Sequence, residues 1–119
     1  MMDFYDSSGR PCCFSPDNTT LYLWDGTPVA YVTNNVVFSF SGRHLGWFAL
    51  GWLYDRESRP ALFTLSASGG PTRPTIKQSG PKAGQPKQPP MKAMPAMPGQ
   101  RGAPSRTWSS ASGAAYFSQ

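Results

Sequence analysis

A short sequence pattern occurs four times in the first half of the chain, and this repeat constrains the fold more than any other feature. Aligned on a turn residue, the four segments are FYDSSGRPCCF, LYLWDGTPVAY, VFSFSGRHLGW and LYDRESRPALF. Their turn residues are Gly9, Gly26, Gly42 and Ser58, which are 17, 16 and 16 residues apart. Each segment has one aromatic residue four positions before its turn residue and another five positions after it. A fixed period of this kind indicates a fold built from one repeated supersecondary unit.

Each repeat predicts a β-hairpin, because aromatic and β-branched residues flank a tight turn. Asp25-Gly26 and Ser41-Gly42 are expected as two-residue turns. If the turn is instead the glycine and the residue after it, Phe38 and Trp47 face each other directly across the third hairpin. Eight short strands without helical periodicity predict an all-β fold with a small closed or nearly closed sheet, because closure removes exposed edges. The opposite face of the sheet is expected to carry Phe4, Leu21, Val37 and Leu53, with Cys13, Ala30, Gly46 and Leu62 on the returning strands.

The runs GTPVAY and VFSFSGRHLGWF, the GW that follows them, and the ASGGP that leads into a Pro/Lys-rich tail also carry a family resemblance. In these residues the chain resembles the bacterial 4-fold beta flower family over about residues 3 to 71. The resemblance implies a small shallow barrel of four β-hairpins around a pseudo-fourfold axis, in agreement with the repeat. It implies no activity, because that family is of uncharacterised function.

Charge and proline divide the chain into a barrel and a tail. Residues 1–70 hold all 6 acidic residues and 4 of the 11 basic ones, whereas residues 71–119 hold 7 basic residues and no acidic one. We therefore expect a four-hairpin domain at 1–68 and a disordered basic Pro/Gly-rich linker at 69–107, and we expect residues 1–70 to fold by themselves. A short aromatic segment at 108–119 ends the chain.

The cellular compartment is predicted from what the sequence lacks. The N-terminal residues MMDFYDSSGRPCC have no basic region followed by an apolar run, so a secretory signal is not expected. Cys12 and Cys13 are adjacent and suit a disulfide poorly. Because they alternate faces, we expect one to be buried as a small apolar residue and the other to be partly exposed. A cytoplasmic protein is the resulting prediction, with peripheral attachment to a membrane as an option.

Catalytic chemistry is not predicted. His44 is the only histidine and has no nucleophile or orienting partner in the pattern, so we expect neither an enzyme nor a metal site nor a cofactor. Three arginines follow the turn residues directly: Arg10, Arg43 and Arg59. With His44 they form a candidate anion-binding rim, because guanidinium groups bind phosphate and carboxylate through paired donors. Nearby acidic residues would counter this rim.

The C-terminal aromatic residues Trp108, Tyr116 and Phe117 are candidate partner-binding residues, because disordered linkers usually lack large aromatics. They have two possible docking sites, namely the chain's own barrel near Trp52 or a separate partner. The favoured function is a noncatalytic protein-binding or scaffolding module with a tethered recognition peptide. The alternative is a peripheral binder of anionic lipid headgroups or a phosphate-bearing ligand through the arginine rim and basic tail. No specific nucleic-acid binding is expected, and the oligomeric state stays open.

Overall fold

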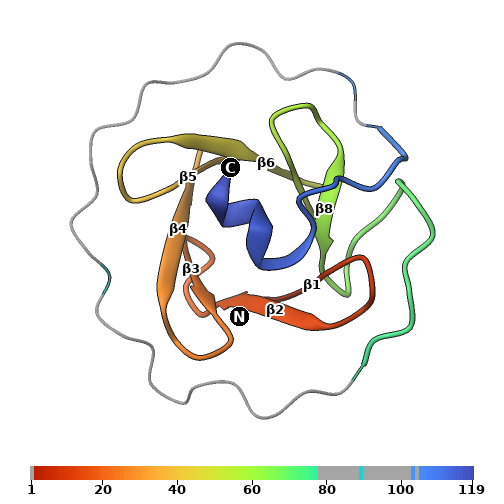
Figure 1. Cartoon of the computed structure of the whole chain (residues 1–119), viewed down its shortest axis with the longest axis horizontal. Coiled ribbons are helices and arrows are strands. Elements are labelled where there is room, and N and C mark those ends of the chain that lie inside the picture. The colour runs from red at the N-terminus through yellow and green to blue at the C-terminus, as the bar shows by residue number, and fades with distance from the viewer. Residues whose placement is uncertain (1, 78–88, 90–102, 104) are drawn as a thin grey trace.

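The fold is a closed antiparallel barrel in which consecutive strands pair and β8 returns to β1 (Figure 1). The structure, a computed structural model, describes residues 2–77, 89, 103 and 105–119. The strands are β1 (Met2–Tyr5), β2 (Pro11–Ser15), β3 (Thr20–Leu23), β4 (Pro28–Thr33), β5 (Val36–Phe38), β6 (His44–Ala49), β7 (Trp52–Tyr54) and β8 (Pro60–Phe63). A 3-10 helix, η1 (Gly113–Ser118), completes the elements. The predicted barrel of four hairpins is confirmed.

Hairpins 1 to 4 consist of β1–β2, β3–β4, β5–β6 and β7–β8. Because the strands alternate in direction, the four hairpin loops lie at one end of the barrel and the connections between hairpins lie at the other. The hairpin loops spread to four sides of the molecule around η1, which lies in front of the centre of the barrel (Figure 1). No helix among the described residues is long and apolar enough to span a membrane.

The hairpin turns differ from the two-residue turns expected at Asp25-Gly26 and Ser41-Gly42. Each turn residue is instead the fourth residue of a turn, and its N–H donates to the carbonyl three residues earlier at 2.8–3.0 Å. The turn residues adopt the left-handed conformation, with φ of 83°, 92°, 89° and 62° in chain order. Glycine adopts this conformation without steric penalty, and Ser58 takes it in hairpin 4. The prediction was wrong because it placed glycine inside the turn rather than at its end.

The register within each hairpin also differs from the prediction, because a β-bulge shifts the pairing on every returning strand. Phe38 pairs with His44 and Val36 pairs with Trp47, so Phe38 and Trp47 are not directly opposite. The extra residue of the bulge moves one aromatic past the other. The aromatics pair instead across the seams where neighbouring hairpins meet, as Phe14–Tyr22, Tyr31–Phe38, Trp47–Tyr54 and Tyr5–Phe63.

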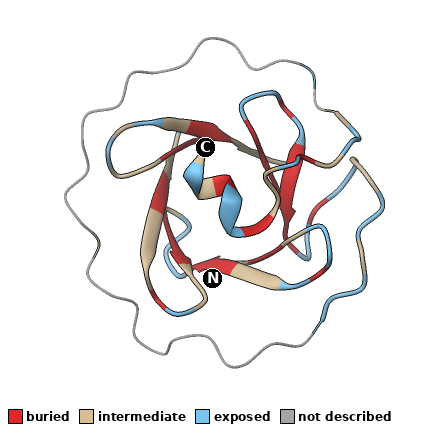
Figure 2. Ribbon diagram, viewed as in Figure 1, coloured by how far each residue is buried: buried red, intermediate tan, exposed pale blue. Residues whose placement is uncertain are grey.

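The inner core agrees with the predicted face of the sheet. Its buried members are Phe4, Cys13, Leu21, Ala30, Val37, Leu45, Leu53, Ala61, Leu62 and Tyr116. Leu45 and Ala61 join this set because the bulge turns two successive residues of a returning strand toward the barrel interior. Figure 2 shows that the buried parts of the strands surround η1. The unexpected member is Tyr116, which comes from the C-terminal end of the chain.

Candidate functional site

The C-terminal segment, residues 105–119, packs onto the barrel, and Tyr116 is its innermost residue. Tyr116 has no exposed surface, and its hydroxyl donates a hydrogen bond of 2.8 Å to the Tyr54 carbonyl. Burial, with the nearby Asp55 and Cys13, raises the pKa of Tyr116 well above its usual value. The hydroxyl therefore stays protonated and able to donate. Phe117 is half-buried, and its ring meets that of Tyr116 edge to face at 5.2 Å.

Trp108 packs on the outside of the barrel, at the seam between hairpins 4 and 1. Its ring meets Trp52 at 5.5 Å and Phe63 at 6.1 Å, in both cases edge to face. Of the two docking sites that the sequence leaves open, the three C-terminal aromatics therefore occupy the chain's own barrel. The vicinity of Trp52 was the region proposed for such docking.

Trp108 completes a pattern that the hairpins themselves leave incomplete. In hairpins 2 and 3 the residue two positions before the turn residue covers an aromatic seam. Trp24 meets Phe14 edge to face at 6.1 Å, and Phe40 meets Tyr31 at 5.7 Å. Hairpin 1 has Ser7 at this position, which has no ring to offer. The C-terminal segment supplies the missing ring, so it is quasi-equivalent to part of a hairpin.

Ser109 fixes the segment to hairpin 4 through both backbone and side chain. Its N–H donates to the Pro60 carbonyl at 2.7 Å, and its hydroxyl donates to Asp55 Oδ2 at 2.6 Å. Both Ser109 and Asp55 are buried. A buried carboxylate oxygen without a hydrogen-bond donor is strongly disfavoured. The Ser109 hydroxyl therefore stabilises buried Asp55 only while the C-terminal segment stays in place.

Ser112 extends the contact to hairpin 1. Its hydroxyl donates to the Ala61 carbonyl at 2.8 Å and accepts the N–H of Ser7 at 2.8 Å. Further back, the N–H of Ser105 donates to the Ser58 carbonyl at 2.9 Å. Residues 109–113 thus fill a space between hairpins 4 and 1. We call this space the occupied site.

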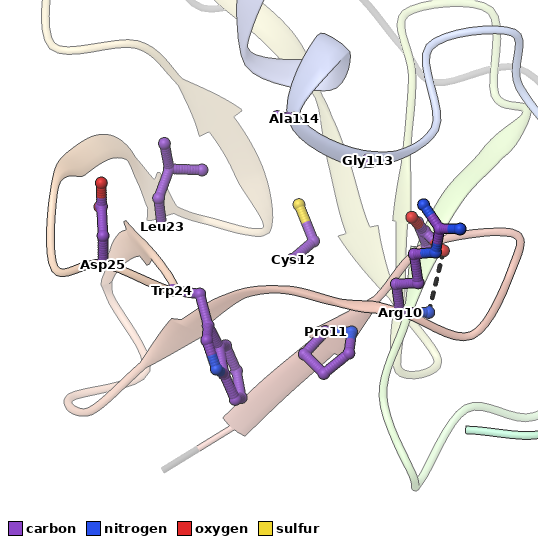
Figure 3. Close-up of a pocket in the computed structure, with 9 residues that line it drawn as sticks. Arg10, Pro11, Cys12, Leu23, Trp24, Asp25, Gly113 and Ala114 are labelled. Carbon is purple, nitrogen blue, oxygen red and sulfur yellow. Dashed lines mark hydrogen bonds between the residues drawn. The ribbon is translucent and has the colours of Figure 1, made fainter. Parts of the chain in front are cut away.

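A hollow of about 410 Å³ lies between hairpins 1 and 2, beside the start of η1 (Figure 3). Its lining residues are Asp6, Arg10, Pro11, Cys12, Leu23, Trp24, Asp25, Gly113 and Ala114. Figure 3 shows Arg10 at one end of the hollow, Asp25 at the other, and the Cys12 thiol between them. The hollow thus has an apolar centre and charged ends, an arrangement suited to binding part of another chain.

The adjacent cysteines differ in exposure. Cys13 lies in the inner core, and burial raises its pKa well above the usual value. Its thiol therefore stays protonated, which suits the predicted role as a small apolar residue. Cys12 is partly exposed in the hollow and also packs against the inner core, because the bulge lies at this position.

The candidate anion-binding arginines are not gathered at one place. Arg10, Arg43 and Arg59 are exposed, and each directly follows the turn residue of a different hairpin. The hairpin loops lie on different sides of the barrel (Figure 1). Arg59 lies 3.4 Å from the carboxylate of Glu57 within its own loop. Of the three, only Arg10 borders the hollow. Anion binding by this set stays a prediction.

His44 lies at the outer seam between hairpins 3 and 4 rather than in the hollow. Its Nε2 donates to the Gly46 carbonyl at 3.1 Å, and its ring meets Trp47 edge to face at 4.6 Å. Burial and the positive charge of Arg56 lower the pKa of His44. Sequence reasoning missed Arg56, although it occupies the position held by Trp24 and Phe40 in the preceding repeats.

The described residues contain no group of three or more His, Cys, Asp or Glu side chains that would hold a metal ion. The predicted linker lies mostly outside the described part of the chain, so its disorder stays a prediction.

The comparisons with known proteins give a family. The model of the 4-fold beta flower protein matches residues 2–117, which include both the barrel and most of the C-terminal segment. No curated protein and no solved structure matches the chain.

Proposed function

The chain belongs to the 4-fold beta flower protein family, and we propose that it is a noncatalytic protein-binding module. The observation that carries this proposal is the hollow between hairpins 1 and 2. Its apolar centre is bordered by Pro11, Leu23 and Trp24, and charged side chains lie at its ends. Partly exposed aromatic and apolar groups bordered by charged side chains are typical of surfaces that bind other proteins.

The C-terminal segment shapes this surface. Gly113 and Ala114 form one wall of the hollow, and the hydrogen bonds of Ser109 and Ser112 fix that wall against the barrel. The segment is therefore proposed to work as part of the binding surface as well as part of the core. The sequence predicted a tethered recognition peptide at the C-terminus. We now propose that this peptide is bound to the barrel of its own chain.

The chemistry of the described residues supports a noncatalytic role. His44 uses one ring nitrogen to donate to a backbone carbonyl and packs against Trp47. The thiol of Cys13 is buried and protonated. Neither group is arranged as a nucleophile with its base.

Site-specific photo-cross-linking in cells would test the proposal. A benzophenone amino acid is placed at Ala114, which is exposed and lines the hollow, and in a control at Ala115, which is exposed but does not line it. We expect discrete cross-linked proteins from position 114 that are absent or much weaker from position 115. Equal cross-linking at both positions, or none at either, would contradict the proposal.

A second candidate is the binding of anionic lipid headgroups or a phosphate-bearing ligand. The exposure of Arg10 and Arg43 and the absence of acidic residues from 71–119 favour it. The spread of the arginines over separate hairpin loops makes it the weaker candidate, because a bound phosphate needs several donors at one place.

A further inference from the structure

The loops of hairpins 1 and 4 share a sequence pattern. Residues 6–11 read DSSGRP in hairpin 1, and residues 55–60 read DRESRP in hairpin 4, so both follow the pattern Asp-x-x-Gly/Ser-Arg-Pro. The corresponding loops of hairpins 2 and 3 read LWDGTP and SFSGRH and lack this aspartate. Hairpin 4 forms one wall of the occupied site, and hairpin 1 forms the matching wall of the hollow.

The two aspartates have the same local geometry. Asp6 Oδ1 accepts the N–H groups two and four residues later at 2.8 and 3.0 Å. Asp55 Oδ1 accepts the equivalent N–H groups at 2.8 and 2.9 Å. In each case one carboxylate oxygen holds the loop. In hairpin 4 the second oxygen, Oδ2, receives the hydroxyl of Ser109.

The carbonyl of the turn residue also accepts a hydrogen bond from a distant segment of the chain in both hairpins. The Gly9 carbonyl accepts the N–H of Lys77 at 2.8 Å, and the Ser58 carbonyl accepts the N–H of Ser105 at 2.9 Å. Segments far away in the sequence thus meet the two loops in the same way. The correspondence covers backbone as well as side-chain contacts.

The two sites differ where hairpins meet. In the hollow, the N–H of Trp24 donates directly to the Cys12 carbonyl at 3.2 Å. In the occupied site, the hydroxyl of Ser112 stands between the equivalent groups of Ser7 and Ala61. Insertion of the segment therefore replaces a direct contact between hairpins with a bridged one.

In the hollow, the position that corresponds to Trp108 of the C-terminal segment is already taken by the ring of Trp24. Its ring meets Phe14 edge to face at 6.1 Å, the same separation at which Trp108 meets the quasi-equivalent Phe63. The hollow therefore contains its own ring where the occupied site takes one from the segment. A chain bound in the hollow needs no large aromatic side chain.

We propose that the hollow binds an extended peptide of small, hydroxyl-bearing residues from a partner protein. A serine or threonine hydroxyl of the peptide donates to Asp6 as Ser109 donates to Asp55, and the N–H of the same residue donates to the Pro11 carbonyl. The model for the ligand is the chain's own SSASG, residues 109–113. The hollow's volume of about 410 Å³ gives room for a few small side chains. This inference rests on the proposed protein-binding function and names its ligand class.

An NMR titration of the full chain with the blocked peptide Ac-SSASG-NH₂ would test the inference. We expect saturable shifts of the amide signals of Asp6, Cys12 and Trp24, with weak affinity because a short free peptide loses much conformational freedom on binding. The hydroxyl-free peptide Ac-AAAAG-NH₂ should bind at least about tenfold more weakly, since Asp6 then lacks its donor. This comparison needs no change to the protein.

A pair of protein variants locates the effect. Asp6→Asn keeps an oxygen that accepts from the loop but removes the negative charge, and it should weaken SSASG binding about tenfold. Asp17→Asn is the matched control, because Asp17 also accepts two backbone N–H groups but lies at the other end of the barrel. This control should bind the peptide as the wild type does.

Three results would overturn the inference: no saturable shifts, shifts confined to the occupied site around Ser58 and Pro60, or equal binding of the two peptides. Such a failure is distinct from failure of the proposed function. Cross-linking at Ala114 without SSASG binding would leave a protein-binding module whose ligand has another chemistry.

Discussion

Replacing Tyr116 with alanine should destabilise the whole barrel, although this residue lies far from the barrel strands in the sequence. The Tyr116 side chain is fully buried in the inner core. Removing a buried aromatic ring in this way costs about 3–5 kcal/mol, from lost burial and the cavity left behind. Against a typical stability of about 5–15 kcal/mol, this loss is large.

A second variant separates the ring from its hydroxyl. Tyr116→Phe keeps the ring but removes the hydrogen bond to the Tyr54 carbonyl, so it should cost about 1 kcal/mol. Ser118→Ala, at an exposed position in the same helix, should change the free energy of unfolding by less than about 0.5 kcal/mol.

Urea unfolding followed by tryptophan fluorescence and far-UV circular dichroism would measure these changes. The urea concentration at the midpoint of unfolding should be lower for Tyr116→Phe than for the wild type, and lowest for Tyr116→Ala. Both variants should unfold in a single transition. A loss below about 1 kcal/mol for Tyr116→Ala would refute the assignment of this residue to the core. The barrel would then fold by itself, as the sequence predicted for residues 1–70.

Three further predictions concern the rest of the barrel. Gly46→Ala should cost about 1–3 kcal/mol or more in urea unfolding, because the added Cβ would collide with a backbone carbonyl oxygen and lie 2.5 Å from the Tyr116 hydroxyl; a neutral effect would contradict the packing. The lowered pKa of His44 means that the unfolded chain binds a proton more readily, so stability should fall as the pH drops below about 6.5. His44→Pro, the residue of the other three repeats, should fold and flatten this pH dependence, and an unchanged slope would show that another group causes it. The lipid alternative predicts that joint replacement of Arg10, Arg43 and Arg59 with glutamine lowers co-sedimentation with anionic vesicles and hardly alters stability, whereas unchanged binding would assign the affinity to the basic tail.

The sequence was sufficient to predict the barrel, because the repeat places one apolar set on one face and one aromatic set on the other. It was insufficient for the register within hairpins. Each hairpin contains one bulge residue, and in hairpin 3 the bulge makes Val36 rather than Phe38 the pairing partner of Trp47. Periodicity alone does not reveal a bulge. The seam partners follow from the bulges and were not predicted.

The site was less accessible to sequence reasoning than the fold. The aromatics Trp108 and Tyr116 signalled a docking segment, but their partners lie more than 40 residues away and are set by closure of the barrel. The shared Asp-x-x-Gly/Ser-Arg-Pro pattern of hairpins 1 and 4 was visible in the sequence. What the pattern binds in hairpin 4 becomes visible only in the structure, through the contact of Ser109 with Asp55.

The chain's own C-terminal segment fills the site between hairpins 4 and 1. The most direct measurement is a nuclear Overhauser spectrum of the full chain at low concentration, where contacts between molecules are negligible. We predict cross-peaks from the Trp108 indole to the rings of Trp52 and Phe63, together with cross-peaks from the Tyr116 ring to the Gly46 α-protons. Sharp, undispersed signals for Trp108 and Tyr116 without such cross-peaks would contradict the account.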